Sequence, residues 1–597
     1  MTPNERADRF VDDEKDFQLG FLLTEQAHSR TRDLSQTAER NPPAGIRMLQ
    51  RVDQDLVVMA ERVLPGRSFE ALVERIADCL LRGGRVGLSG CGATGRLCLL
   101  LESAWRLFWQ RCASAHADAA AGMQDRLCGF MTGGDYAFIR SVESFEDYET
   151  FGAQQVRDNG LGSGDLVIGI SEGGETSSVI GSVLEGLRRG ADAAFVCNNP
   201  HEILRQRLAR CRRLLDDPRV LALDLTSGPM AVAGSTRMQA TTGEMLIVGA
   251  AIELALSRAA GRLGVECPDA LLPHGGDAIG YARRFRQLLA DLETDRNVAA
   301  MAGWAAMEAE TYRRGNVLTY YGDLALVDIL TDTTERTPTF GLPPFLRRTS
   351  DSSIRPMAFV KHPCLSTDQT WLGILQRPPQ CLTWTSETYR QLGAEARIAD
   401  NPPEISLADL MEFEIGSEPA PSRWRSAGDT AMLVGCDADF SEDRTFELPD
   451  AFRHAAASFP KHAACLVVPP ETAAAMPDCD AAWQISYTAQ QTPLRLFDHL
   501  ALKLVFNTVS TASMALLGRI HGNWMTYVLP TNKKLIDRGT RIIAGLTGLG
   551  YREACRELYR EMSDGGNLAE RPSPVHAALD RILAGERNAR SGPMHTS

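Results

Sequence analysis

The sequence predicts an α/β protein with two doubly wound parallel sheets and a helical N-terminal arm. Short apolar runs alternate with longer stretches of helical periodicity through most of the chain, which is the pattern of parallel sheets covered by helices. This alternation begins twice, once near residue 85 and again near residue 316. A chain of 597 residues also exceeds what one hydrophobic core usually supports. We therefore expect two large α/β domains.

Composition excludes several classes of function. The formal net charge of −13 argues against a protein that binds nucleic acid regardless of sequence, because such a protein needs a dominant Lys/Arg surface. The 14 cysteines form no Cys-x-x-Cys pair and no Cys/His cluster at zinc spacing, so we expect reduced thiols and no metal. Residues 1–16 are charged, and no uninterrupted apolar run reaches the roughly 18 residues of a membrane span. We expect a cytoplasmic protein without a membrane segment.

The first strand ends in a loop with the composition of a phosphate-binding turn. Helical periodicity covers residues 24–81, and an apolar run from residue 86 then leads into Gly90, Gly92 and Gly95. Glycines allow the backbone to turn with converging amide groups, and Thr94 adds a hydroxyl at the N-terminus of the next helix. This geometry suits an anionic phosphoester.

Two further loops have similar chemistry. Ser171-Glu-Gly-Gly-Glu-Thr-Ser177 follows an apolar strand at 165–170, and Gly234-Ser-Thr-Arg-Met238 begins a helical pattern that reaches about residue 263. Ligands bind beyond the carboxyl ends of strands in such sheets, so hydroxyls and a guanidinium at these places predict further anion contacts. The alternative is that Thr94, Ser171 and Ser235 only cap helices.

The second half repeats the pattern with differences. Strands are expected at 316–321, 429–435, 464–468 and 483–487, and an amphipathic helix at 500–517. The loop after Tyr321 lacks the glycine and hydroxyl residues of the first half. We therefore expect a degenerate second domain without a phosphate loop.

Seven motifs, in this order, resemble those of the bacterial N-acetylmuramic acid 6-phosphate etherases and the glucokinase regulatory protein. The motifs are Gly90-Cys-Gly-Ala-Thr-Gly-Arg-Leu97, Thr132-Gly-Gly-Asp135 with Val142-Glu-Ser-Phe-Glu-Asp147, Gly169-Ile-Ser171, Cys197-Asn-Asn-Pro200, Gly234-Ser-Thr-Arg-Met238, Leu504-Val-Phe-Asn-Thr-Val-Ser-Thr511 and Thr531-Asn-Lys-Lys-Leu535. The resemblance implies sugar isomerase (SIS) domains, each with a five-stranded parallel sheet, and a C-terminal helical lid. It divides the chain into an arm (1–75), SIS domain 1 (76–270), SIS domain 2 (271–525) and a lid with tail (526–597).

The resemblance also implies which residues contact a phosphorylated sugar. These are Gly92, Thr94 and Gly95 in the first loop, Ser171, Gly173 and Thr176 in the second, Ser235, Thr236 and Arg237 in the third, and Asn532 and Lys534 near the C-terminus. No cofactor and no metal are implied. The alternative for Lys534 is an ordinary solvated lysine.

Two glutamates are implied as the catalytic pair of an etherase. Glu146 matches the base, which removes the proton α to the carbonyl. The acid position in the first domain is occupied by Ala104, but Asp332-Thr-Thr-Glu335 stands at the equivalent place in the second. In a two-domain chain the second domain takes the place of a dimer partner, so Glu335 is the expected acid. Alternatively, both glutamates only accept hydrogen bonds from ligand hydroxyls or lie on helix surfaces.

Two functions follow from the resemblance. The first is a lyase that releases D-lactate from N-acetylmuramic acid 6-phosphate. The second is a non-catalytic sensor of fructose 6-phosphate or a similar ester, which regulates a sugar kinase as its partner. Pro338 stands where the regulatory protein has a histidine, which argues against a regulatory ligand switch of the same design. An aldose–ketose isomerase is disfavoured because the ring-opening histidine or lysine of that branch has no counterpart here.

Overall fold

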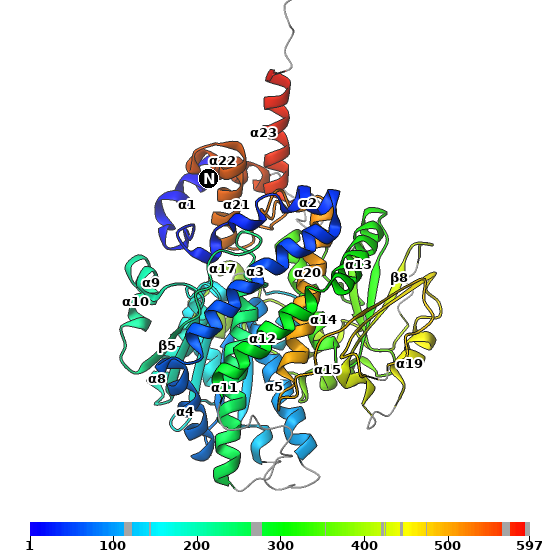
Figure 1. Cartoon of the computed structure of the whole chain (residues 1–597). Helices are drawn as coiled ribbons and strands as arrows, with labels where there is room; N and C mark the ends of the chain where they lie inside the picture. Colours follow the sequence, from blue (N-terminus) through cyan, green and yellow to red (C-terminus); the bar gives the residue numbers. More distant parts are fainter. Residues whose placement is uncertain are drawn as a thin grey trace, which may run out of the picture.

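The structure is a computed structural model in which two parallel sheets flank a central set of long helices (Figure 1). It describes residues 1–112, 122–142, 145–263, 277–350, 352, 354–419, 423, 425–441, 446–472, 474–563 and 573–590. Each sheet has five strands, all parallel. The predicted fold class is confirmed.

The N-terminal arm consists of helices, and its longer ones pack against the central helices. Its α-helices are α1 (Pro3–Asp13), α2 (Leu34–Arg40), α3 (Pro42–Val63) and α4 (Arg67–Leu81). The Asn41 side chain accepts a hydrogen bond from the Ala44 amide, and the prolines that follow Asn41 suit the first turn, so α3 begins there. Helix α3 packs against α11, α12 and α13, and α4 packs against α11 and the first sheet.

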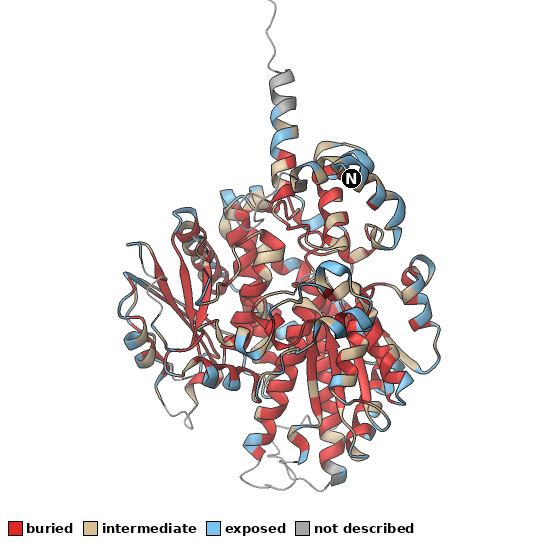
Figure 2. Cartoon of the chain, turned by 180° about the vertical axis from the view of Figure 1, so that it is seen from behind, coloured by how far each residue is buried: buried red, intermediate tan, exposed pale blue. Residues whose placement is uncertain are grey.

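The first sheet has the strand order β2-β1-β3-β4-β5. The strands are β1 (Val86–Gly90), β2 (Leu127–Met131), β3 (Leu166–Ser171), β4 (Asp192–Cys197) and β5 (Val220–Asp224), and the helices are α5 (Gly92–Cys112), α7 (Glu149–Asp158), α8 (Ser177–Arg188), α9 (His201–Arg207) and α10 (Ala209–Leu215). Side chains alternate between the two faces: Ile168 packs into the central core, whereas Val167 and Phe195 pack into smaller clusters on the opposite face. Both faces are therefore buried, and the strands are buried along most of their length (Figure 2).

The second sheet repeats this topology with the order β7-β6-β8-β9-β10. Its strands are β6 (Leu318–Tyr321), β7 (Ala358–Lys361), β8 (Thr430–Cys436), β9 (Lys461–Val467) and β10 (Ala481–Ile485), and its helices are α14 (Leu326–Phe340), α15 (Thr367–Leu375), α16 (Ser386–Gln391), α17 (Ala396–Ala399), α18 (Leu407–Met411) and α19 (Leu448–Ala455). Strand β7 was not predicted. Its short apolar run at 357–360 lies between Pro356 and Pro363, and this pattern does not distinguish a strand from a loop.

A carboxylate occupies the anion position of the second sheet. Asp439 accepts hydrogen bonds from the amides of Leu324, just after β6, and Cys436, at the end of β8, at 2.9 and 2.8 Å. Burial raises the pKa of Asp439 to about 6. These two amide groups at the ends of β6 and β8 are therefore satisfied within the protein.

Long helices join the two sheets. They are α11 (Gln239–Leu263), α12 (Ala278–Leu292), α13 (Asp295–Arg313) and α20 (Leu496–Leu516). Helix α20, expected to be amphipathic, is instead buried on nearly all sides, because it lies between the domains. Residues 239–260 of α11 are long and apolar enough to cross a membrane, but this window is 94% buried, so the protein core accounts for its composition.

The C-terminal helices cover the carboxyl ends of the first sheet and contact the N-terminal arm. They are α21 (Lys533–Thr547), α22 (Tyr551–Ser563) and α23 (Pro574–Arg590), with α22 beside α1 (Figure 1). Glu25 accepts from Arg538 at 2.5 Å and from Arg541 at 2.6 Å. Burial alone would raise the pKa of Glu25, but these two arginines outweigh it and lower the pKa to about 2.

The domain limits given above remain a proposal. The limit at 75/76 falls inside α4, so this helix belongs to both the arm and the first domain. The limit at 270/271 lies outside the described residues, as does the end of the tail from residue 591. Cysteines in the described part of the chain are free thiols, and most are buried.

Candidate functional site

One cleft lies at the carboxyl ends of β1, β2 and β3 and takes its walls from both domains. Glycine loops of the first domain form its floor, and α14 of the second domain and the start of α21 form its sides. Its lining includes Gly92, Arg96, Glu146, Glu172, Thr176, Ser235, Thr236, Arg237, Glu335, Pro338, Asn532, Lys534 and Arg538. Residues from six segments of the sequence therefore meet in one place.

The first loop presents a helix N-terminus and an arginine to the cleft. Gly92 has a φ of +55°, a left-handed conformation that favours glycine, and a Cβ there would lie 3.7 Å from Glu335. Arg96 is fully buried; its guanidinium donates to the carbonyls of Phe138 and Ala137 and forms an ion pair with Glu335. The first loop thus holds the predicted acid of the second domain in place.

Several predicted hydroxyls are used inside the protein instead of facing the cleft. The Thr94 hydroxyl donates to Glu244 at 2.6 Å. The hydroxyls of Ser171 and Thr176 lie 2.9 Å apart, and Ser171 also accepts from the Gly174 amide. Of these residues only Thr176 lines the cleft. The second loop is therefore organised by its own hydrogen bonds.

The predicted glycines Gly95 and Gly173 serve close packing below the cleft. A Cβ on Gly95 would lie 2.5 Å from the Met131 side chain, and one on Gly173 would lie 1.8 Å from the Glu175 carboxylate. Both distances are shorter than contacts between real atoms. These glycines let helix α5 and the second loop approach their neighbours.

The third loop carries an unused hydroxyl. Ser235 is 4% exposed, lines the cleft, and its Oγ has no hydrogen-bond partner among the described residues. Buried polar atoms without partners are costly, so this hydroxyl is a natural contact for a ligand. Thr236 lines the cleft beside it and is more exposed.

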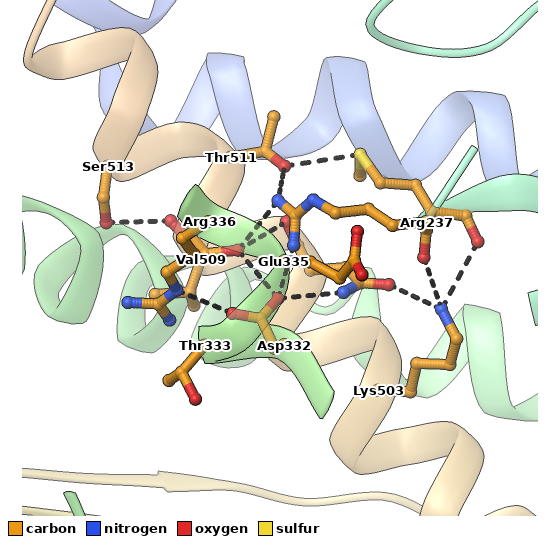
Figure 3. Close-up of polar contacts among 12 residues, drawn as sticks. Arg237, Asp332, Thr333, Glu335, Arg336, Lys503, Val509, Thr511 and Ser513 are labelled. Carbon is orange, nitrogen blue, oxygen red and sulfur yellow. Dashed lines mark hydrogen bonds and ion pairs between the residues drawn. The ribbon is translucent and has the colours of Figure 1, made fainter. Parts of the chain in front are cut away.

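Arg237, the next residue, forms hydrogen bonds across the domain interface. Its guanidinium pairs with Asp332 at 2.6 Å and donates to Ser510 and Thr511 at 3.0 and 2.9 Å (Figure 3). Asp332 lies on α14, and the two hydroxyls lie on α20. The third loop is thereby fixed to the second domain, while the buried Nε of Arg237 has no hydrogen-bond partner among the described residues.

Asp332 is the centre of a buried polar network. It accepts from Arg336 at 2.8 Å, from Asn507 at 2.9 Å and from Ser510 at 2.9 Å (Figure 3). Arg336 also pairs with Glu308 at 2.5 Å. Burial would raise the pKa of Asp332, but Arg336 and Arg237 outweigh it and lower the pKa. Asp332 therefore stays ionised.

Glu146 reaches the same cleft from the segment after β2. Its carboxylate accepts from the Asn532 side chain at 2.7 Å, and the Cys91 thiol lies 3.7 Å away. Burial raises the pKa of Glu146, which Lys534 partly counters. Asn532 also caps α21 by accepting from the Leu535 amide at 2.8 Å, so one residue links the lid helix to this carboxylate.

Lys534 is paired rather than solvated. Its ammonium lies 2.6 Å from Glu175. Burial acts to lower the pKa of Lys534, but Glu175, Glu146 and Glu25 outweigh it and raise the pKa above its usual value. Lys534 thus remains charged beside the second loop.

Every described cation in the cleft lining has a carboxylate partner. These pairs are Arg96 with Glu335, Arg237 with Asp332, Lys534 with Glu175 and Arg538 with Glu25. An anion bound here would be met by hydroxyls and backbone amides more than by free positive charge.

The sequence analysis did not identify two candidate functional residues, Arg96 and Glu172, although both lie within the loops that it selected. Arg96 lies within the first glycine motif, and its partner Glu335 is 239 residues away, so no local pattern pointed to the pair. Glu172 follows Ser171 and lines the cleft. Burial raises the pKa of Glu172 to about 7. The charge of Lys534 lowers this pKa, and the charge of Glu335 raises it further.

The first part of the chain is similar in sequence to known proteins. Residues 69–186 match the family model described as the glucokinase regulatory protein N-terminal SIS domain. The N-acetylmuramic acid 6-phosphate etherase of Jannaschia sp. (strain CCS1) is 33% identical over 230 residues, which are 38% of this chain and 64% of that protein. N-acetylmuramic acid 6-phosphate etherase 1 of Bacillus licheniformis is 26% identical over 230 residues, 38% of this chain and 67% of that protein.

The chain spans about two thirds of the length of these curated relatives. Among solved structures, the C-terminal domain of glucosamine-fructose-6-phosphate aminotransferase from Francisella tularensis is 10% identical with a TM-score of 0.43, over 79% of this chain and 94% of that one. The resemblance predicted from the motifs, to the etherases and the glucokinase regulatory protein, is confirmed by the family model and the curated relatives.

Removing one partner from the network around Asp332 should destabilise the protein strongly. Asp332→Asn leaves Arg237 buried without its carboxylate, so we expect a loss of about 3–5 kcal/mol in the free energy of unfolding, measured by urea titration. Wild-type protein should lose this contribution as the pH falls through the lowered pKa of Asp332, whereas the variant should not. Glu310→Gln, at an exposed carboxylate paired with Arg313 and Arg314, is the control and should change little. Equal stability of the two variants would contradict the role of the network.

Proposed function

We propose that this protein binds a sugar 6-phosphate in the cleft between its domains and acts as an etherase-type carbon–oxygen lyase, releasing D-lactate from N-acetylmuramic acid 6-phosphate. The observation that carries the proposal is the meeting of Glu146 from the first domain and Glu335 from the second in one cleft beside the hydroxyl-bearing third loop. The etherase relatives support the choice of reaction.

The phosphate binds at the third loop in this proposal. Ser235 offers an unpartnered hydroxyl, Thr236 a second, and the N-terminus of α5 at Gly92 adds backbone amides. Because the nearby cations are already paired, these neutral donors carry the recognition. The phosphate would then hold the sugar with its reacting carbons near the carboxyl groups.

The reaction needs a base and an acid at the same pH. Glu146, ionised, removes the proton next to the carbonyl of the open-chain sugar; the C–O bond to lactate then breaks, and the lactate oxygen takes a proton. Atom balance requires one water to add to the resulting double bond to give N-acetylglucosamine 6-phosphate. The hydrogen bond from Asn532 orients Glu146 for the first step.

Two carboxyl groups are candidates for the proton donor. Glu335 stands at the position that the resemblance implies, and it is our first choice. It forms an ion pair with Arg96 across the cleft. Glu172 lines the same cleft, and its pKa of about 7 keeps it protonated in a large fraction of molecules at neutral pH. We retain Glu172 as the second candidate.

The alternative function is a sugar-phosphate sensor that regulates a sugar kinase. The match of residues 69–186 to the glucokinase regulatory protein model favours it, as does a lid helix attached to the cleft through Asn532 and Lys534. A ligand that moved this helix would change the surface formed by α21, α22 and α1.

Two serine variants test where the phosphate binds. Ser235→Ala should weaken binding of N-acetylglucosamine 6-phosphate by about 1–3 kcal/mol in calorimetry, the range for a hydrogen bond to a charged group, without loss of stability. Ser171→Ala is the matched control: it removes bonds to Thr176 and Gly174, so it should lower stability by about 1 kcal/mol and affect binding less. Unchanged affinity in Ser235→Ala would remove the third loop from the phosphate site.

Three glutamate variants separate the steps. Glu146→Gln should lose both exchange of the sugar C2 proton with solvent and lactate release, each by at least about a hundredfold. A variant that lacks the proton donor should still exchange the C2 proton with solvent but should no longer release lactate. NMR in deuterium oxide monitors this exchange. Glu335→Gln and Glu172→Gln therefore show which group donates.

The pH profile gives an independent reading of the donor. Lactate release should rise with pH as Glu146 ionises and, if Glu172 donates, fall again above about pH 7, because that group must be protonated. The alkaline fall should vanish in Glu172→Gln. Wild-type protein that binds the sugar phosphate with neither exchange nor lactate would exclude the lyase and leave the sensor.

A further inference from the structure

A second cleft lies at the carboxyl ends of β6, β7 and β8, where helix α5 of the first domain closes it. We propose that this second cleft is a separate binding site for a small carboxylic acid with an apolar body. The site does not depend on the lyase or sensor function proposed above, since none of its lining residues belongs to the first cleft.

The two clefts are related by the repeat of the sheets. The first lies on β1, β2 and β3 and is closed by α14 of the second domain; the second lies on β6, β7 and β8 and is closed by α5 of the first. Ala104, the counterpart of Glu335, lines the second cleft. Asp439 already occupies the backbone amides that would receive a phosphate. The second cleft therefore has neither a counterpart of Glu335 nor free backbone amides for a phosphate.

What remains is a cavity with mostly apolar walls. Leu107, Leu326, Val327, Ile374 and Leu502 contribute to a space of about 560 Å³. This volume lies within the range of about 300–1,000 Å³ that small-molecule sites occupy, and such sites combine apolar walls with a few polar groups. The body of the ligand should therefore be hydrocarbon.

Two donors at the start of α20 remain available to a ligand. His499 uses Nδ1 for Asp328, at 2.8 Å, and so keeps Nε2 as a second donor when protonated. Arg495 lies 3.8 Å from Asp437 and 3.9 Å from Asp498, which are long ion pairs. Both residues line the cleft. Their charge and the N-terminus of α20 favour an anionic head group.

Each carboxylate that lines this cleft has a hydrogen-bond partner within the protein. Asp323 lies 3.2 Å from the ring of His362, and Asp498 accepts from Tyr487 at 2.8 Å. The cationic groups that line the cleft, Arg495 and His499, favour an acceptor ligand over an amine. A singly charged carboxylate suits one guanidinium and one imidazole better than a phosphate does, because Asp439 already occupies the backbone amides that would receive a phosphate.

Backbone strain is concentrated here too. In the described part of the chain, the non-glycine residues with a left-handed φ are Gln376 (55°) and Arg495 (51°), and both line the second cleft. Such conformations cost energy and gather at ligand sites. Arg495 thus combines a strained backbone with the positive charge that an anionic head group would meet.

The test compares hexanoate with 1-hexanol, which shares the apolar body and lacks the charge. Saturation-transfer NMR and calorimetry on the full chain should show saturable binding of hexanoate in about the millimolar range and weaker binding of hexanol. Arg495→Gln and His499→Asn should each weaken hexanoate at least about tenfold and leave hexanol unchanged. Arg390→Gln, at an exposed arginine paired with Asp400, is the matched control and should change neither.

Blocking variants locate the site. Leu107→Trp narrows a wall of the cleft, and Gly373→Trp places its side chain where no atom lies within 4 Å of the Cβ position. Both should abolish hexanoate binding while binding of N-acetylglucosamine 6-phosphate in the first cleft continues. Non-saturable hexanoate binding, binding unaffected by both tryptophans, or equal loss of hexanol in Arg495→Gln would each overturn the proposal. Retained sugar-phosphate binding shows that a negative result is not a folding failure.

Discussion

The buried ion pair between Arg237 and Asp332 is the contact on which the rest of the cleft depends. It joins the third loop of the first domain to α14 of the second, and Ser510 and Thr511 of α20 complete its hydrogen bonds. An ion pair of this kind is costly to bury and costlier to break, so it fixes a geometry more than it adds stability. Because Glu335 lies one turn further along α14, the same contact sets where that carboxylate meets Arg96.

This arrangement explains how one chain can hold a site made of two domains. The sheets share one strand order, and each is closed by the helix that follows the first strand of the other. The first sheet keeps its glycine loops and the second has filled its anion seat with Asp439, so the two clefts differ in chemistry although they are alike in position. The lid adds Asn532 and Lys534, and its arginines at 538 and 541 anchor it to Glu25 of the arm.

The sequence predicted the fold class because alternating strands and helices leave a strong periodic signal, and it predicted that the loops meet because parallel strands end at one edge. It missed β7, whose short apolar run between two prolines does not distinguish a strand from a loop. It placed Thr94 and Ser171 at a ligand, whereas the structure turns their hydroxyls to Glu244 and Thr176; a hydroxyl in a loop does not reveal which way it points. Arg96 and Glu172 act through partners or burial that only the fold supplies.

The central claim is that one ligand touches both domains of the same chain. A crystal structure with N-acetylglucosamine 6-phosphate bound tests it directly. The account predicts the phosphate within hydrogen-bond distance of Ser235 and Thr236, with Glu146 and Glu335 both reaching the same sugar ring, roughly 3 Å from its oxygens or one water away. A sugar phosphate held by the first domain alone, with Glu335 still closed on Arg96 and out of reach, would contradict it.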